Sequence, residues 1–442
     1  MTVERAHYAV ADVFVVGGQP TVTYTGRADA RVGKAISRYL ATRPGKMIVV
    51  TGPSKAGKTV LIRHLAPTAV HVTGGEVTSL SEFWNAVGDH LPIWTSESAS
   101  RKVTRDHQAA NTLKGGLRTP IAELGGEYKT AQGKAEELTH VEGRERSVAQ
   151  RVKSHLIAEK RTPLFLDDFH HIDPAVQKQV VRALKDMTFK QVPIILAAVP
   201  HRVVDVVTRE KEMKGRVETH AIVPWGSEEL IGIAASGFGQ ALNVECPAPI
   251  ATRLARESFG SPHLMQDLCL ELAVDQDVLE TVQERVKLRP PSDGWDAFFR
   301  QIAERNVVDD TYRSLKSGPR ERSDRIPRPL KSGGHVDTYE LILTAIRIAL
   351  GRAVEDTNRD EPTTLTWTEI RPILGDLLSD KVPAWHEVKR ALNKMDEIAH
   401  KLAASADPED PYGSEPVLVF EPQKELVHIT DPFFLFQLRW HV

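Results

Sequence analysis

One eight-residue segment constrains the fold of this chain more than any other feature. Gly52-Pro-Ser-Lys-Ala-Gly57-Lys58-Thr59 fits the pattern G-x4-G-K-[ST], which arises by chance in roughly one or two per cent of chains this long. Glycines let backbone N–H groups curl around phosphate oxygens, Lys58 reaches the outer phosphates, and the Thr59 hydroxyl ligates Mg²⁺. An apolar strand at 47–50 precedes the segment and a helix follows it, which is the context that such a loop requires. The residues expected to hold a nucleotide here are Gly52, Pro53, Ser54, Lys55, Ala56, Gly57, Lys58, Thr59 and Val60.

A second apolar strand ends in two acidic residues. Leu164-Phe-Leu166 runs directly into Asp167 and Asp168. Beside a phosphate-binding loop, Asp167 is expected to hold Mg²⁺ through water, and Asp168 to orient or deprotonate the attacking water. The alternative is that the two aspartates cap a turn.

Buried strands alternate with helices in the first half of the chain. We expect helices at 27–42, 79–91, 146–160 and 175–187, a strand at 192–199, and two N-terminal strands at 13–16 and 21–24. Asp173 and Pro174 are suited to open the helix at 175–187, as its cap and its first residue. This order predicts an α/β fold with a parallel sheet. The polar stretch 95–145 is expected to be an insertion.

Composition narrows the classes of function. The 442 residues imply two or three domains, and the net charge of −2 gives no overall bias toward nucleic acid. The two cysteines have no metal-ligand spacing and suit a reducing cytosol, so a cytoplasmic protein is expected. The N-terminus lacks the apolar core of a signal peptide, so no signal peptide is expected. The sequence contains no run of about 18 apolar residues, so no membrane span is expected.

These motifs resemble those of the AAA+ and STAND branches of P-loop ATPases, near the replication-initiator-like clade. Gly52–Thr59 matches the Walker A motif and Leu164–Asp168 the Walker B motif of that family. Tyr24-Thr-Gly-Arg27 resembles the family's N-terminal box, which implies that Arg27 lies near the adenine. The resemblance implies an ATPase that uses ATP and Mg²⁺ and assembles as a homo-oligomer.

Three further segments align with the family's sensing residues. Ile194–Pro200 lies where sensor 1 is expected, but lacks its polar residue, so Arg202 or His201 would have to substitute. Arg216 resembles an arginine finger that reaches a neighbouring subunit; the alternative is a surface arginine. Gly260-Ser-Pro262-His263 resembles the start of a helical lid, with His263 where an arginine usually senses phosphate. A histidine is largely neutral at pH 7, which favours a slow nucleotide switch.

The C-terminal residues resemble a winged helix. Helices are expected at 337–350, 366–378 and 384–402, and wing strands at 417–420 and 427–430. The third helix mixes cations and acids on its polar face, so both DNA contact and partner docking remain open. The resemblance implies four parts: an ATPase core at 1–225, a helical lid at 226–290, a linker at 291–335 and a winged helix at 336–442.

The linker is the one strongly basic segment. Residues 313–331 hold seven Lys or Arg against Glu321 and Asp324, a net charge of +5, with prolines that disfavour a regular helix. It is either a solvated tether or a contact for a polyanion, which could be DNA, RNA or an acidic face of a neighbouring subunit. Two functions follow from the family resemblance. The first is a nucleotide switch or oligomeric motor that acts on a separate effector or partner protein, and family analogy suggests bacterial defence or mobile DNA as its context. The second is a DNA-binding ATPase of the initiator or transposition-helper type.

Overall fold

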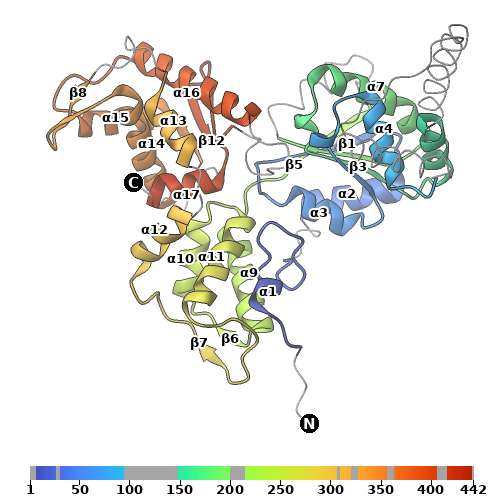
Figure 1. The fold of residues 1–442 in the computed structure, drawn as a ribbon, viewed down its shortest axis with the longest axis horizontal. Helices are drawn as coiled ribbons and strands as arrows, with labels where there is room; N and C mark the ends of the chain where they lie inside the picture. Colours follow the sequence, from blue (N-terminus) through green and yellow to red (C-terminus); the bar gives the residue numbers. More distant parts are fainter. Residues whose placement is uncertain are drawn as a thin grey trace, which may run out of the picture. The chain divides into compact units, whose positions relative to one another are not determined.

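The structure, a computed structural model, describes residues 6–25, 30–93, 148–199, 215–305, 309–319, 327–355, 363–405 and 416–440. Its residues fall into two compact units (Figure 1). Unit 1 comprises Met1–Gly33, Thr51–Leu61 and Ala221–Val442, and unit 2 comprises Lys34–Val50 and Ile62–His220. Among the described residues, no helix is long and apolar enough to cross a membrane.

A five-stranded parallel sheet lies at the centre of the α/β fold, as the alternation of strands and helices predicted. Its strands are β1 (Met47–Thr51), β2 (Val70–Thr73), β3 (Leu164–Asp167), β4 (Ile194–Ala198) and β5 (Val217–Ala221). They lie in the order β2-β3-β4-β1-β5. The central strands β1, β3 and β4 are buried along their whole length, which explains their uninterrupted apolar sequences. Strand β2, a four-residue alternating segment, was not predicted.

Helices cover the sheet on both faces. They are α2 (Arg31–Thr42), α3 (Lys58–Leu65), α4 (Leu80–Asp89), a helix at 148–158 and α7 (Pro174–Phe189), with single 3-10 turns η2 (Gly74–Glu76) and η3 (Phe169–His171). Alternate strand residues such as Val49 and Leu166 pack with Phe83 of α4 and Leu184 of α7 in one apolar core. In Figure 1, α2 lies on the other side of the sheet from α7.

The helix α7 begins where its sequence predicts. The Asp173 carboxylate accepts a hydrogen bond from the Ala175 amide at 2.8 Å, and Pro174 occupies the first helical turn. Proline suits this position because its missing N–H would have no partner within the helix. The expected cap and helix are therefore confirmed.

Unit 1 is mainly helical. Its first part holds α1 (Val10–Val13), α9 (Ser227–Ala234), a π-helical continuation (Ala235–Ala241), α10 (Ala248–Glu257) and α11 (Pro262–Asp275). The strands β6 (Val244–Glu245) and β7 (Val286–Lys287) form a small parallel pair. Two more helices follow, α12 (Trp295–Arg305) and α13 (Asp309–Ser317), and then the antiparallel pair β8 (Arg328–Pro329) and β9 (His335–Val336).

The C-terminal segments have the helices and strands that the sequence predicted. The helices are α14 (Thr338–Glu355), α15 (Trp367–Leu377) and α16 (Trp385–Ser405). The strands β10 (Thr364–Thr366), β11 (Leu418–Glu421) and β12 (Leu426–Ile429) form an antiparallel sheet in the order β10-β12-β11. A last helix, α17 (Pro432–Trp440), follows β12.

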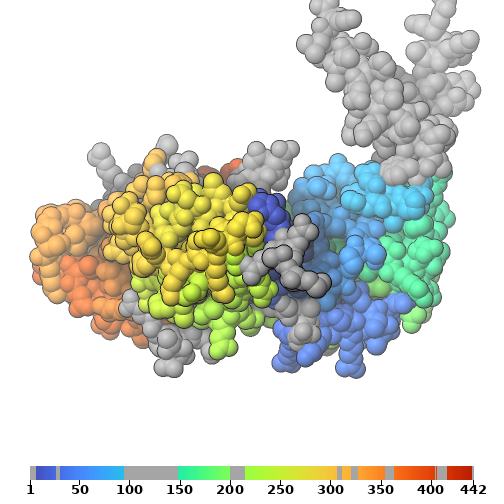
Figure 2. Space-filling model, turned by 90° about the horizontal axis from the view of Figure 1, so that it is seen from below, coloured from blue at the N-terminus to red at the C-terminus, as the bar shows by residue number. Residues whose placement is uncertain are grey.

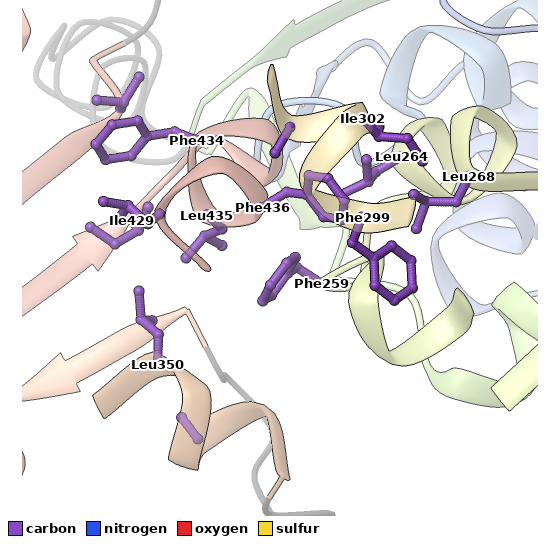
Figure 3. Close-up of a cluster of buried hydrophobic side chains, with 14 of the residues drawn as sticks. Phe259, Leu264, Leu268, Phe299, Ile302, Leu350, Ile429, Phe434, Leu435 and Phe436 are labelled. Atoms are coloured by element: carbon purple, nitrogen blue, oxygen red, sulfur yellow. The ribbon is translucent and has the colours of Figure 1, made fainter. Parts of the chain in front are cut away.

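Helix α17 joins the two halves of unit 1 through its apolar side chains. Phe434, Leu435 and Phe436 are almost completely buried. Figure 3 shows Phe436 beside Phe299 of α12, and these two rings meet edge to face at 5.8 Å. In Figure 2 the yellow surface of the helical part runs on into the orange and red surface of the C-terminal part. Both parts belong to one apolar core.

The two N-terminal strands were predicted wrongly. Residues 10–13 form the short helix α1, and 21–23 form a turn. The apolar run here is buried side-on against helices: the Phe14 and Phe238 rings lie 4.8 Å apart. A β-carbon at Gly237 would come within 2.3 Å of the Phe14 ring, so only glycine allows this contact. Burial against helices therefore replaces strand pairing.

The expectation of an irregular segment between the lid and the C-terminal domain was also partly wrong. Helices α12 and α13 lie within 291–335, and Arg313 and Lys316 belong to α13. Three of the basic side chains are engaged: Lys316 pairs with Glu340 at 2.9 Å, Arg328 pairs with Glu387, and Lys331 donates to the Gly375 carbonyl. Arg320, Arg322 and Arg325, like the proposed insertion at 95–145, lie outside the described residues.

Truncation of Phe436 tests the role of α17 in unit 1. We expect Phe436→Ala to lower the free energy of unfolding by about 3–5 kcal/mol, because it removes a fully buried aromatic ring and leaves a cavity. Phe189→Ala is the matched control, since that ring is 75% exposed and its loss should change stability by less than about 0.5 kcal/mol. Urea titration measures both. Equal effects would show that α17 does not hold the unit together.

Candidate functional site

The segment Gly52–Thr59, called the phosphate loop below, connects β1 to α3 and is built around a buried lysine. The Lys58 side-chain ammonium donates hydrogen bonds to the carbonyl oxygens of Gly52 at 3.0 Å and Pro53 at 2.8 Å. Lys58 is only 6% exposed. Gly57 has a φ of +86°, in the left-handed region that favours glycine. A β-carbon at Gly52 would lie 2.9 Å from the Ile222 carbonyl oxygen, so this glycine permits a close backbone approach.

Residues from the helical part of unit 1 hold the outside of the phosphate loop. The Trp225 indole N–H donates to the Ala56 carbonyl at 3.0 Å, and the Ser261 hydroxyl donates to the Lys55 carbonyl at 3.4 Å. A buried indole N–H requires a polar partner, but the sequence does not reveal which carbonyl supplies it.

The lid motif lies against the same loop. Gly260 has a φ of +74°, Ser261 caps α11 by accepting from the Leu264 amide, and Pro262 occupies its first turn. A β-carbon at Gly57 would lie 3.8 Å from the Pro262 ring. The structure thus brings Pro262 to the phosphate loop.

His263 follows in the first turn of α11 and is held as a neutral imidazole. Its ring meets the Phe433 ring edge-on at 5.1 Å. Burial, and then the positive charge of Lys55, lower the pKa of His263 to about 4, although Asp431 opposes the shift. A neutral imidazole contributes no charge toward a phosphate.

Asp167, at the end of β3, is oriented by a histidine that sequence reasoning missed. The carboxylate is 3% exposed, and its oxygens lie 3.0 Å from the Asp168 amide and 3.3 Å from His71 Nε2. The Arg63 guanidinium lies 2.6 Å from His71 Nδ1. Because a guanidinium can only donate, Nδ1 accepts, and the proton on Nε2 faces Asp167. The pairing of β2 with β3, unpredicted from the sequence, places His71 there.

Asp168 occupies a strained turn. Its backbone is left-handed, with φ 46° and ψ 42°, and its carbonyl accepts from the His171 amide at 2.9 Å. A β-carbon at Gly74 would lie 2.2 Å from that carbonyl oxygen, so Gly74 is required for η2 to pack against the turn. Left-handed geometry is costly for a residue with a side chain and is concentrated at functional sites. Asp168, His170 and His171 also bring ligand-type atoms within 4.8 Å of one another.

The other predicted site residues divide into those that the structure describes and those that it does not. Arg216 precedes β5, is half-buried, and accepts a hydrogen bond from the Met47 amide through its carbonyl. Thr59 and Val60 lie in the first turn of α3 and are half-buried. Strand β4 ends in Ala197 and Ala198, both fully buried. Arg27, Arg202 and His201 lie outside the described residues.

The pKa of His263 predicts a pH dependence of stability. Unfolded histidine takes up a proton near pH 6.5, whereas folded His263 does so only near pH 4, so the unfolded state binds more protons between these values. Stability should therefore fall, by roughly 3 kcal/mol at most, as pH drops through this window. Urea unfolding at pH 7 and pH 4.5 should show a smaller loss for His263→Gln than for wild type. His90→Gln, at an exposed position, should behave like wild type; equal losses in all three would refute the assignment.

Comparison with known proteins supports part of this picture. Residues 25–196 match the family model of an AAA ATPase domain, which confirms the expected ATPase resemblance for that part of the chain. No curated protein matches the chain.

Solved structures of three proteins are similar to the chain at low identity. Cdc6p from Pyrobaculum aerophilum is 12% identical, with a TM-score of 0.39, over 97% of this chain and 96% of that one. The ORC2 protein of Aeropyrum pernix, in its ADPNP–ADP complexes, is 10% identical, with a TM-score of 0.45, over 96% and 95%. The RuvB Holliday junction branch migration motor of Thermotoga maritima is 15% identical, with a TM-score of 0.35, over 66% and 78%.

Proposed function

We propose that this chain binds ATP at the phosphate loop and hydrolyses it slowly, as a nucleotide-dependent switch of the AAA+/STAND type. The observation that carries the proposal is the state of Lys58. Its ammonium is buried, and among the described residues it meets two carbonyl oxygens and no carboxylate. A buried ammonium held only by dipoles strongly favours an anion. The match of residues 25–196 to an AAA ATPase domain supports ATP as the source of that anion.

From the Walker A and Walker B motifs, we propose that Thr59 and Asp167 hold the magnesium ion that accompanies the nucleotide. Mg²⁺ prefers oxygen ligands and keeps several waters, so a hydroxyl and one carboxylate suffice. Asp167 is buried and oriented by His71, which limits its rotation. When bound, the ion would neutralise charge on the phosphates.

Asp168 and Arg216 are the proposed catalytic residues. Asp168 is half-buried, directly follows Asp167 and has a left-handed backbone conformation. This position suits a base that orients the attacking water. Arg216 would reach the γ-phosphate of a neighbouring copy, which implies a homo-oligomer.

Three features favour a switch over a DNA-driven motor. His263 is neutral at pH 7, and β4 ends in alanine where a polar sensor is expected. Basic side chains proposed to contact DNA, Lys316 and Arg328, are paired with Glu340 and Glu387. We propose that the three-helix, three-stranded C-terminal part is a winged helix that docks a separate effector or partner protein.

Replacement of Lys58 tests the nucleotide site. Lys58→Ala should weaken ATP binding by at least ~30-fold, because loss of one partner of a buried charge pair costs about 2–5 kcal/mol. Lys178→Ala, on the exposed face of α7, is the control and should bind as wild type does. Calorimetric titration with ATP and Mg²⁺ measures both. Unchanged affinity in Lys58→Ala would exclude the phosphate loop as the binding site.

Replacement of Asp168 separates hydrolysis from binding. Asp168→Asn should retain ATP binding and slow phosphate release by at least ~100-fold, the lower range for loss of a general base. Asp173→Asn changes an equivalent charge five positions later and keeps its helix cap, so it should hydrolyse ATP at the wild-type rate. If Asp168→Asn turns over normally, another residue is the base.

A further inference from the structure

One ion pair connects the phosphate loop to the C-terminal helix. The Lys55 ammonium lies 2.5 Å from the Asp431 carboxylate, and these side chains are only 9% and 8% exposed. Lys55 lies within the phosphate loop, in a left-handed backbone conformation with φ 58°. The two residues are 376 positions apart in sequence but belong to the same compact unit. This pair therefore places the poorly hydrated Asp431 carboxylate beside the loop that is proposed to bind phosphate.

Asp431 is fixed in that position by a second set of contacts. Its other oxygen accepts hydrogen bonds from the Phe433 amide at 2.7 Å and the Phe434 amide at 2.9 Å, which caps α17. The Lys55 ammonium also lies over the Phe433 ring, 4.4 Å from its centroid. The first turn of α17 thus presents one carboxylate and one aromatic face to Lys55.

The far end of α17 is anchored just as firmly. Glu257 of α10 is completely buried, and its carboxylate accepts from Arg439 Nε at 3.0 Å and from the Trp440 indole N–H at 3.0 Å. Between the two ends, Phe434 and Phe436 lie in the apolar core (Figure 3). Lys55 therefore contacts a helix that is held to α10 and to the core of unit 1.

We propose that Asp431 is a positioning residue that competes with nucleotide phosphates for Lys55, so that nucleotide binding and the docking of α17 oppose each other. The proposal rests on the proposed nucleotide binding. Bound phosphates and the Asp431 carboxylate are like charges beside one ammonium, and like charges in a poorly hydrated place repel strongly. Coupling of this kind is reciprocal: whatever loosens α17 tightens nucleotide binding, and bound nucleotide loosens α17.

The conservative variant Asp431→Asn tests the competition. Asparagine caps a helix as well as aspartate does, so α17 should still begin at the same place while the charge is lost. ADP with Mg²⁺ should bind at least five-fold more tightly than to wild type, the lower end of typical coupling between sites. Asp337→Asn is the matched control, because Asp337 caps α14 in the same way, accepting hydrogen bonds from two backbone amides at 2.9 Å each. Its affinity should stay within about two-fold of wild type.

Two further variants test the same competition, so that the conclusion does not depend on the correct folding of Asp431→Asn alone. Lys55→Gln should bind ADP more weakly than wild type, because the Asp431 charge is then uncompensated, and Lys55→Gln/Asp431→Asn should bind more tightly than Lys55→Gln. Wild-type affinity, or weaker binding, in Asp431→Asn would overturn the inference and leave the proposed function intact. Absence of ADP binding by wild type itself would overturn the proposed function and this inference with it.

Discussion

The candidate site depends on the contacts that fix the conformation of the phosphate loop, which contains the buried cations Lys55 and Lys58. Lys58 is satisfied by two carbonyl oxygens of its own loop, and Lys55 by a carboxylate from the C-terminal helix. Trp225 and Ser261 hold the loop carbonyls from outside. These contacts hold the loop in one conformation in the absence of nucleotide.

The same contacts tie the phosphate loop to the rest of unit 1. Helix α17 meets the phosphate loop through Asp431 and meets α10 through Arg439 and Trp440. Its middle lies in an apolar core shared with α12. A switch requires an element with two arrangements, and the ligand must shift the balance between them. We propose that α17 is this element, because the Asp431 carboxylate that caps it would be repelled by bound phosphate.

Features fixed by neighbouring residues could be predicted from the sequence, and those fixed by distant contacts could not. Strands β1 and β3, the helix that follows β1 and the cap of α7 are encoded in local patterns, so their prediction succeeded. The apolar run around Phe14 has the composition of a strand but is buried against Phe238, more than two hundred positions away. His71 beside Asp167 and Asp431 beside Lys55 arise from strand pairing and chain folding, for which the sequence holds no local sign.

The central claim is that the phosphate loop binds one nucleotide per chain. Calorimetric titration of the wild-type protein with ATP and Mg²⁺, under conditions that prevent turnover, measures this stoichiometry directly. The account predicts saturable binding of one ATP for each chain, which Mg²⁺ strengthens and a large excess of ADP displaces. Heat that does not saturate at millimolar ATP, or binding that ADP leaves unchanged, would contradict it.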